Sequence, residues 1–386
     1  MANLYYAQPL LDVIAADLGV AGHDAAIVVT TSQLGYAGGL LLLVPLGDML
    51  DRRALVTRLL LACAVALAVA ALAPSLAVLA VALAAVGVLS VVAQIVVPMA
   101  STLAPEHERG TVVGMVMSGL LIGILAARTV AGFVSEIGSW RLTFWLGAVA
   151  MVALALALWR SLPSGRAAEP LPYRRLIGSV FGLVREEPLL RRRMVYGACG
   201  MGTFSVLWTA LSLLLAEPPF EYSEAAIGLF GLAGIAGAVA AQASGRLADA
   251  GHRHGSTGVF WLLVALGWVA LLAGETTVAL ILLGIVVLDA GVQGQHILNQ
   301  STIFAIDERT RSRLNTAYMT SNFLWGAIGS GAAAWAWSAH GWPLVCAIGG
   351  AFAAVALAMW AYETVSPAAP GTVRPRGSSS AQSAPS

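Results

Sequence analysis

The sequence of 386 residues contains no lysine, because all 21 of its basic residues are arginine. This absence excludes a Schiff-base lysine and the lysine of a phosphate-binding loop, so the sequence holds no Walker motif. Charged residues make up only 11% of the chain, against roughly a quarter in a typical soluble domain, while 59% is hydrophobic. With a mean hydropathy of +0.82, a water-soluble fold is excluded. A net charge of +1 gives no excess of basic residues with which to bind nucleic acid.

Cysteine is also rare. Cys63, Cys199 and Cys346 lie far apart, each in an apolar run, so they are expected to pack as small hydrophobic side chains and not to form disulfides or a zinc site. The chain has no H-E-x-x-H motif and no Gly-x-Ser-x-Gly nucleophile elbow. We therefore expect no enzymatic activity, no metal and no cofactor.

Apolar runs long enough to cross a bilayer, which takes about 20 residues, fill most of the chain. Twelve are predicted, with approximate spans 2–18, 25–47, 55–73, 76–101, 110–134, 140–159, 194–216, 224–247, 256–274, 277–303, 312–336 and 341–362. The first begins almost at Met1 and is barely long enough, so we interpret it as the back part of a truncated first helix. Tryptophans near predicted span ends, Trp208 among them, are expected in the membrane interface.

Arginine lies almost entirely on one side of these spans. The loops after spans two, four, six, eight and ten carry Arg52, Arg53, Arg58, Arg109, Arg160, Arg166, Arg174, Arg175, Arg185, Arg191, Arg192, Arg193, Arg246, Arg253, Arg309, Arg311 and Arg313. The opposite loops carry Arg141 alone, together with seven acidic residues. Because cytoplasmic loops are enriched in arginine, both termini are predicted to be cytoplasmic in a bacterial inner membrane.

The long polar connection divides the chain. We predict an N-terminal six-helix half at 1–160, a cytoplasmic linker at 161–193 and a C-terminal six-helix half at 194–363. The remainder, 364–386, is rich in proline and serine and is predicted to be disordered.

The two halves resemble each other at an offset near 200 residues. The segment 47–51 has a counterpart at 245–249, Ser101 and Thr102 match Ser301 and Thr302, and Trp140 matches Trp342. Because these three matches fall at equivalent positions of the two predicted six-helix halves, they indicate that one half arose by duplication of the other. Two six-helix halves around a central pathway are the plan of a transporter built from parallel repeats.

A loop motif after the second span extends this pattern. Gly47, Asp51, Arg52 and Arg53 stand as G-x-x-x-D-R followed by a further basic residue, and Gly245, Asp249 and Arg253 form a degenerate copy. With the repeat, this motif resembles the major facilitator superfamily over the whole chain. The resemblance implies an all-α membrane fold of twelve helices in two pseudo-symmetric halves, and a conformational latch at the motif; the alternative is that these residues only set topology.

The first residues narrow the resemblance. The run 3–11, Asn-Leu-Tyr-Tyr-Ala-Gln-Pro-Leu-Leu, looks like the first-helix signature of a bacterial branch of sugar or drug efflux permeases. Drug antiporters of the family carry a glycine-rich fifth helix that ends in a Gly-Pro pair. Here Ala127 and Arg128 occupy that region, which departs from the antiporter pattern.

Polar residues inside the spans mark a pathway or a partnered site. In the tenth span Asp289, Gln293, His296 and Gln300 are spaced by four, three and four residues, which places them on one helix face. The resemblance implies that helices one, four, seven and ten line the cavity. Asp289 is the first candidate for carrying a proton and His296 the second; the alternative is that the stripe joins helices by hydrogen bonds.

The first, fourth and fifth spans add further candidates. Tyr5, Gln8 and Asp12 share one face of the first helix by the same spacing, and Gln94 lies on the fourth. Arg128 lies deep in the fifth span and needs a counter-charge. The resemblance implies that helices one and five lie together, so we predict that Asp12 on the first helix pairs with Arg128. The pair either anchors or gates an anionic substrate, or is a buried structural ion pair.

These features favour a secondary transporter that moves a small organic solute by alternating access, with proton-coupled export as the first hypothesis. A drug, a sugar or a metabolite fits an apolar cavity with scattered polar groups. Uptake or facilitated diffusion is the alternative, and a membrane sensor is a third. The expected partners are the lipid bilayer, the solute and protons, without nucleic acid, and the chain is expected to be a monomer.

Overall fold

The computed structural model describes residues 2–103, 105, 109–163, 172–235, 237, 240, 244, 253–307 and 310–365. Every regular element in these ranges is helical, so the predicted all-α fold is confirmed. Side-chain caps mark several helix starts. Asp51 accepts a hydrogen bond from the backbone N–H of Ala54 at 2.8 Å, and Ser139 and Ser223 cap two later helices in the same way.

The elements of the N-terminal half, meaning the chain before residue 164, follow in this order: η1 (Ala2–Leu4), η2 (Gln8–Leu10), α1 (Leu11–Leu18), α2 (Gly22–Ala25), α3 (Ile27–Leu42), η3 (Val44–Asp48), α4 (Arg52–Ala71), α5 (Leu76–Leu89), α6 (Val92–Leu103), α7 (Arg109–Ile137) and α8 (Trp140–Ser161).

The elements of the C-terminal half, meaning the chain after residue 171, are α9 (Tyr173–Glu186), α10 (Pro188–Ala216), α11 (Glu224–Leu229), η5 (Phe230–Gly234), α13 (Arg253–Ala273), α14 (Val278–Phe304) and α15 (Arg311–Val365).

Each predicted span falls on one helix or a series of helical segments, with the eighth described only in part. Among the described residues, eight helices are long and apolar enough to cross a membrane. The predicted linker 161–193 contains α9. Helix α10 begins at Pro188, before the predicted boundary at 194, and proline suits this first position because its missing N–H has no partner there in any helix. Of the predicted tail, 364–386, the described part ends with α15 at Val365. The domain boundaries themselves stay a prediction.

The eleventh and twelfth spans form one continuous element, α15, with a sharp turn at Gly341. There the backbone has φ of 65° and ψ of −152°, a region that favours glycine because a side chain would clash. The turn divides α15 into a first arm, 311–340, and a second arm, 342–365. The predicted interruption between spans eleven and twelve is thus present.

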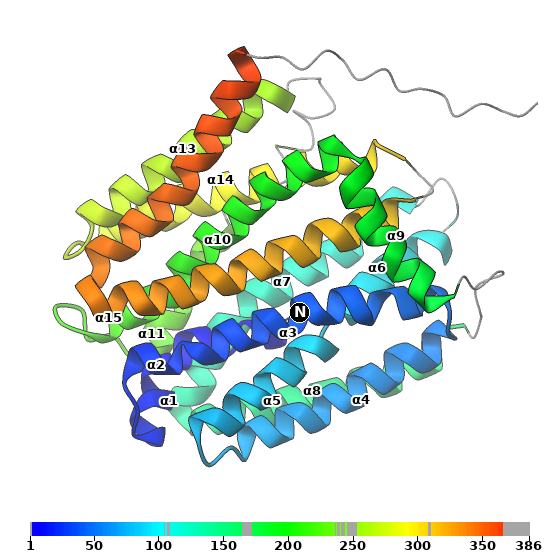
Figure 1. The fold of residues 1–386 in the computed structure, drawn as a ribbon. Coiled ribbons are helices and arrows are strands. Elements are labelled where there is room, and N and C mark those ends of the chain that lie inside the picture. Colours follow the sequence, from blue (N-terminus) through cyan, green and yellow to red (C-terminus); the bar gives the residue numbers. More distant parts are fainter. Residues whose placement is uncertain are drawn as a thin grey trace, which may run out of the picture.

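Figure 1 shows how the helices are arranged. Helices α3, α7, α10 and the first arm of α15 lie in the middle of the bundle; α4, α5 and α8 lie on one side and α13, α14 and the second arm on the other. The first arm of α15 packs against both α10 and α3, so it joins the two halves. One end of the bundle carries α1, α2 and α11, and we call it the α11 end; the opposite end carries α9, and we call it the α9 end.

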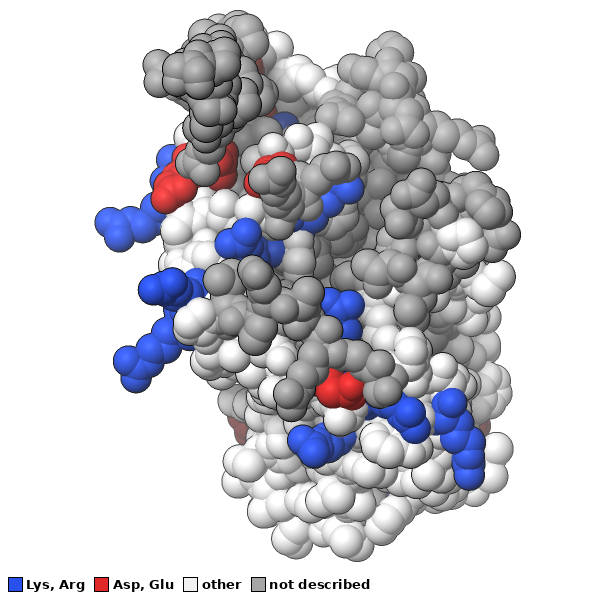
Figure 2. Space-filling view, turned by 90° about the vertical axis from the view of Figure 1, so that its right-hand side faces the viewer, with Lys and Arg blue, Asp and Glu red and all other residues white. Residues whose placement is uncertain are grey.

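Large apolar side chains cover the outside of the bundle. Val65, Val81, Val149 and Val269 are each more than 60% exposed, which an aqueous surface disfavours and hydrocarbon favours. Figure 2 looks at the α9 end and shows basic side chains spread over it with few acidic ones. This distribution agrees with the charge asymmetry in the sequence, and by the predicted topology the α9 end is cytoplasmic.

Candidate functional site

A buried arginine lies between helices of the two halves. Arg128, on α7, is 3% exposed, and its Nε donates a hydrogen bond to Oε1 of Gln8 at 2.8 Å. Its guanidinium carbon lies 4.0 Å from the ring centroid of Trp208, 4.8 Å from that of Tyr5 and 5.6 Å from that of Phe204. Aromatic faces stabilise a cation where water is excluded.

An aspartate from the other half faces this arginine across the indole of Trp208. Asp289, on α14, is 3% exposed, and its Oδ1 accepts a hydrogen bond from Nε1 of Trp208 at 3.3 Å. The charges of Arg128 and Asp289 attract each other. We call this group the arginine–aspartate cluster, and its members are Tyr5, Gln8, Arg128, Phe204, Trp208 and Asp289.

The cluster joins the two halves of the chain. Tyr5, Gln8 and Arg128 come from the N-terminal half, whereas Phe204, Trp208 and Asp289 come from α10 and α14. Any motion that separates the halves at this depth must therefore separate opposite charges.

The guanidinium of Arg128 is incompletely satisfied. Its Nη2 is buried and has no hydrogen-bond partner among the described residues. Because a buried donor without a partner costs about 1–3 kcal/mol, and more when it is charged, such a group needs a reason. Neither its bond to the neutral Gln8 nor the bond of Asp289 to Trp208 supplies an acceptor for Nη2.

A second polar group lies further along α14. The His296 and Tyr318 rings stack with centroids 5.7 Å apart, and the Tyr318 hydroxyl lies 3.3 Å from Nδ1 of His296. Asn299 donates to the Tyr318 hydroxyl at 3.2 Å and accepts from Gln295 at 3.1 Å. Gln295 and Asn299 were not predicted, since they lie off the stripe that the three-and-four spacing selects.

The predicted stripe on α14 is distributed over several environments. Asp289 belongs to the arginine–aspartate cluster and His296 to the second polar group. Gln293 packs beside Gly237, where an added Cβ would lie 2.8 Å from Cγ of Gln293, and Gln300 is half-buried. The stripe therefore contributes two of its four members to polar contacts across helices.

Polar and aromatic contacts also join α3 of one half to α10 and α15 of the other. Thr30 and Ser330 hydroxyls lie 3.1 Å apart, and Ser205 donates to Oε1 of Gln33 at 3.1 Å. Tyr36 and Phe323 rings lie 4.3 Å apart. These contacts hold the halves together from the α11 end to the middle.

The predicted residue of the fourth span, Gln94, bridges the halves. It donates to the Tyr36 hydroxyl at 3.5 Å and accepts from Asn315 on α15 at 3.3 Å. Its position beside a cross-half contact agrees with the expectation that it lies on the inner side of the bundle.

The predicted pair of Arg128 with Asp12 is wrong. Asp12 is exposed, whereas Tyr5 and Gln8 are buried and contact Arg128. The three residues do not share a face because the chain runs as 3₁₀ and turn segments up to Leu10 and becomes α-helical only at Leu11. A 3₁₀ segment has three residues per turn, so the spacing of an α-helix fails there.

Trp208 was missed as a site residue. It was expected in the membrane interface, but it is 3% exposed and lies inside α10, two turns before its end. Its spacing from Phe204, four residues earlier on the same helix, was the available signal. That signal alone does not separate a site from ordinary packing.

The loop motif after the second span makes local contacts. Asp51 caps α4, Arg52 donates to the carbonyl of Gly47 at 2.9 Å, and the Arg53 guanidinium lies 4.2 Å from the Trp159 ring. In the second copy, Gly245 and Asp249 lie outside the described residues, and Arg253 is described only as the first residue of α13. The latch stays a prediction.

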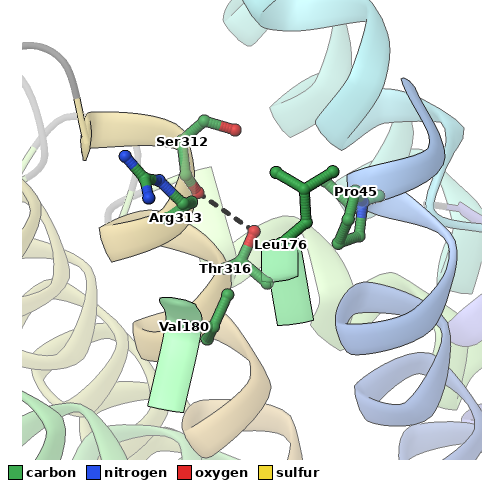
Figure 3. Close-up of a pocket in the computed structure, with 7 residues that line it drawn as sticks. Pro45, Leu176, Val180, Ser312, Arg313 and Thr316 are labelled. Carbon is green, nitrogen blue, oxygen red and sulfur yellow. Dashed lines mark hydrogen bonds between the residues drawn. The ribbon is translucent and has the colours of Figure 1, made fainter. Parts of the chain in front are cut away.

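A small pocket lies at the α9 end, where the linker helix meets both halves. Figure 3 shows Leu176 of α9 between Pro45 of η3 and Thr316 of α15, whose hydroxyl donates to the Ser312 carbonyl at 3.0 Å. Tyr173 adds a hydrogen bond to the Leu42 carbonyl at 2.8 Å. Helix α9 is thereby fastened to η3 and to the start of α15.

A larger groove of about 530 Å³ lies between α10 and the two arms of α15. Its lining is apolar apart from Arg191 and Ser321. None of the cluster residues lines it, so we do not assign it to the site.

Comparison with known proteins agrees with this architecture. Residues 1–330 match the model of the Major Facilitator Superfamily. YgaY of Escherichia coli (strain K12), named as a transporter, is 48% identical over 360 residues, which cover 93% of this chain and 91% of YgaY. SCO4007 of Streptomyces coelicolor, also named as a transporter, is 37% identical over 95% of this chain and 85% of its own length.

A solved structure shares the fold. The inward-facing, occupied form of a bacterial homolog of the human lysosomal transporter Spinster superposes with a TM-score of 0.71 at 13% identity, over 94% of this chain and 93% of that one. Because the family model matches residues 1–330 and YgaY is 48% identical over 93% of this chain, the chain belongs to the Major Facilitator Superfamily. It is a membrane transporter and not an enzyme.

Proposed function

We propose that this transporter moves a small organic solute across the bacterial inner membrane by alternating access, as proton-coupled export. The observation that carries the proposal is the arginine–aspartate cluster, in which a carboxyl group from one half and a cation from the other contact the same indole, that of Trp208. Alternating access separates and rejoins such groups. Asp289 is the residue that takes up and releases the proton.

The other predicted residues support this pathway. Tyr5, Gln8 and Arg128 form the part of the cluster that the N-terminal half supplies. We assign His296, Gln94, Gln293 and Gln300 to the same pathway. The motif at Gly47, Asp51, Arg52 and Arg53, with its copy at Gly245, Asp249 and Arg253, acts as the conformational latch. The working unit is a monomer with both termini in the cytoplasm, and its partners are lipid, solute and protons.

Uptake of a solute together with a proton is the second candidate. The position of Arg128 beside Asp289 favours it, because a proton on Asp289 removes the charge that the guanidinium attracts and leaves Arg128 open to an anion. Export and uptake thus use the same residues and differ in direction.

The test is efflux of a panel of drugs, sugars and organic acids from bacteria that lack their own exporters. Wild-type protein, Asp289→Asn and a treatment that collapses the proton gradient are compared, with Asp17→Asn as the matched control, because Asp17 pairs with Arg141 at an exposed position. Proton-coupled export predicts loss in the first variant and after collapse, and no loss in the control. Accumulation in place of export indicates uptake, and efflux indifferent to both changes contradicts coupling through Asp289.

A further inference from the structure

The arginine–aspartate cluster carries a charge that bears on what the transporter can bind. A guanidinium stays protonated in proteins, so Arg128 brings a permanent positive charge into the bundle. Its Nε is occupied by a neutral partner, Gln8, and its Nη2 has no partner among the described residues. Asp289, the acid whose charge acts on Arg128, accepts its hydrogen bond from Trp208.

We propose that Arg128 binds the anionic group of the solute and that the solute is an organic anion, a carboxylate attached to an apolar body that carries a ring. This inference rests on the proposed transport of an organic solute and is independent of its direction. A carboxylate fits the planar fork of a guanidinium and accepts two parallel hydrogen bonds. Nη2 supplies a donor to which no described residue offers an acceptor.

The rings around Arg128 define the rest of the solute. Tyr5, Phe204 and Trp208 surround the guanidinium, and Trp208 is the nearest at 4.0 Å. The atoms next to a carboxylate held by Arg128 therefore meet aromatic faces. Flat apolar groups pack on such faces, whereas sugars need hydrogen-bond partners around their hydroxyls.

Asp289 competes with the solute for the same cation. The ionisable groups whose charges act on Arg128 among the described residues are Tyr5 and Asp289, and Tyr5 is neutral in its ordinary protonated form. With Asp289 ionised, the charge of Arg128 is already balanced; with Asp289 neutral, it is available to one monovalent anion. The acid is therefore a regulator of anion binding, and Asp289→Asn should strengthen binding.

Thermal stabilisation of the purified full-length protein tests the inference without any transport. The probes are benzoate, cinnamate and 1-naphthoate at millimolar concentration, each matched with its neutral amide. Wild-type protein is expected to be stabilised by carboxylates and not by amides. Arg128→Gln should weaken carboxylate binding by about tenfold or more, the loss expected for a charge-assisted hydrogen bond, and Arg128→Lys should restore part of it.

Two further variants keep the test decisive if Arg128→Gln does not fold. Asp289→Asn should bind the carboxylates more tightly than wild type, a gain that misfolding does not produce. Arg141→Gln, which removes an arginine paired with Asp17, should bind as wild type does.

Equal stabilisation by amides and acids, carboxylate binding that survives Arg128→Gln, or no stabilisation by any carboxylate overturns the inference. Its failure is distinguishable from failure of the proposed function. If the protein exports a solute but binds no carboxylate, the proposed anion site is wrong and the transport proposal stands. If it binds carboxylates but its flux does not depend on the proton gradient, only the proposed proton coupling is wrong.

Discussion

At the scale of single residues, Trp208 has two contacts that a variant can separate. Its indole N–H donates to Asp289, and its ring lies over Arg128. Because the two contacts come from different parts of one side chain, phenylalanine keeps an aromatic face and removes the donor.

Trp208→Phe is expected to impair transport and to lower the free energy of unfolding by about 1.5–3 kcal/mol, the range for a hydrogen bond to a charged group. Trp268→Phe is the matched control, since Trp268 donates to the Thr203 hydroxyl at 2.6 Å inside the C-terminal half. It should lose stability and keep transport. Solute flux and thermal unfolding measure the two effects, and equal flux in both variants would show that the bond to Asp289 has no part in transport.

The sequence predicted the two charged members of the cluster and not their arrangement. Asp289 and Arg128 stand out because ionisable residues inside apolar spans are rare. The partner of Arg128 was predicted wrongly, since the choice of Asp12 assumed a regular α-helix from the first residues. Trp208 could not be predicted, because composition gives no information on which tryptophan lies beside a charge.

At the scale of helices, the spans were predictable and their contacts were not. Hydropathy locates α4, α8, α10, α13 and α14 to within several residues, because a bilayer demands long apolar helices. Which helices touch depends on side-chain fit that periodicity does not encode. The close approach of α7 and α11 is one such contact.

A substitution at Gly228 on α11 tests the close contact between α7 and α11. A Cβ there would lie 2.8 Å from the carbonyl oxygen of Arg128, and the Thr129 hydroxyl donates to the Gly228 carbonyl at 3.0 Å. Gly228→Val is expected to hold α7 and α11 apart and to abolish transport, because packed backbones leave no room for the added atoms. Spin-label distances between the two helices should lengthen, while Gly255→Val, at a position with nothing within 4 Å of an added Cβ, should leave them unchanged.

Helix α9 gives a second prediction at this scale. Leu176 and Val180 are 6% and 3% exposed, whereas Phe181, on the same helix, is 55% exposed. Leu176→Ala is expected to weaken docking by about 2–5 kcal/mol, the range for truncating a buried leucine. Backbone amides of α9 should then exchange hydrogen faster, and Phe181→Ala should leave the rate unchanged. Unaltered exchange in Leu176→Ala would mean that α9 does not depend on this contact.

At the scale of the whole molecule, the two halves are closed against each other at the α11 end. The Thr30 and Ser330 hydroxyls lie 3.1 Å apart on α3 and α15, and alternating access requires these helices to part there. All three native cysteines are buried, so a new pair at this position can be oxidised selectively.

The double variant Thr30→Cys and Ser330→Cys should form a disulfide under mild oxidation and stop transport, because the crosslink keeps the α11 end closed. Reduction should restore transport. Each single variant serves as the control and should be insensitive to oxidation. A crosslinked protein that transports at the wild-type rate would show that this end need not open.

The division of the cluster between the halves also has a consequence for synthesis of the chain. Asp289 follows Arg128 by 161 residues, which a ribosome adding about 5–20 residues per second takes roughly 10 to 30 s to make. Throughout that interval α7 holds a cation in the membrane without its acidic neighbour. Of the cluster, only Tyr5 and Gln8 precede Arg128 in the sequence, so they are the only cluster members available to the nascent arginine until the second half is made.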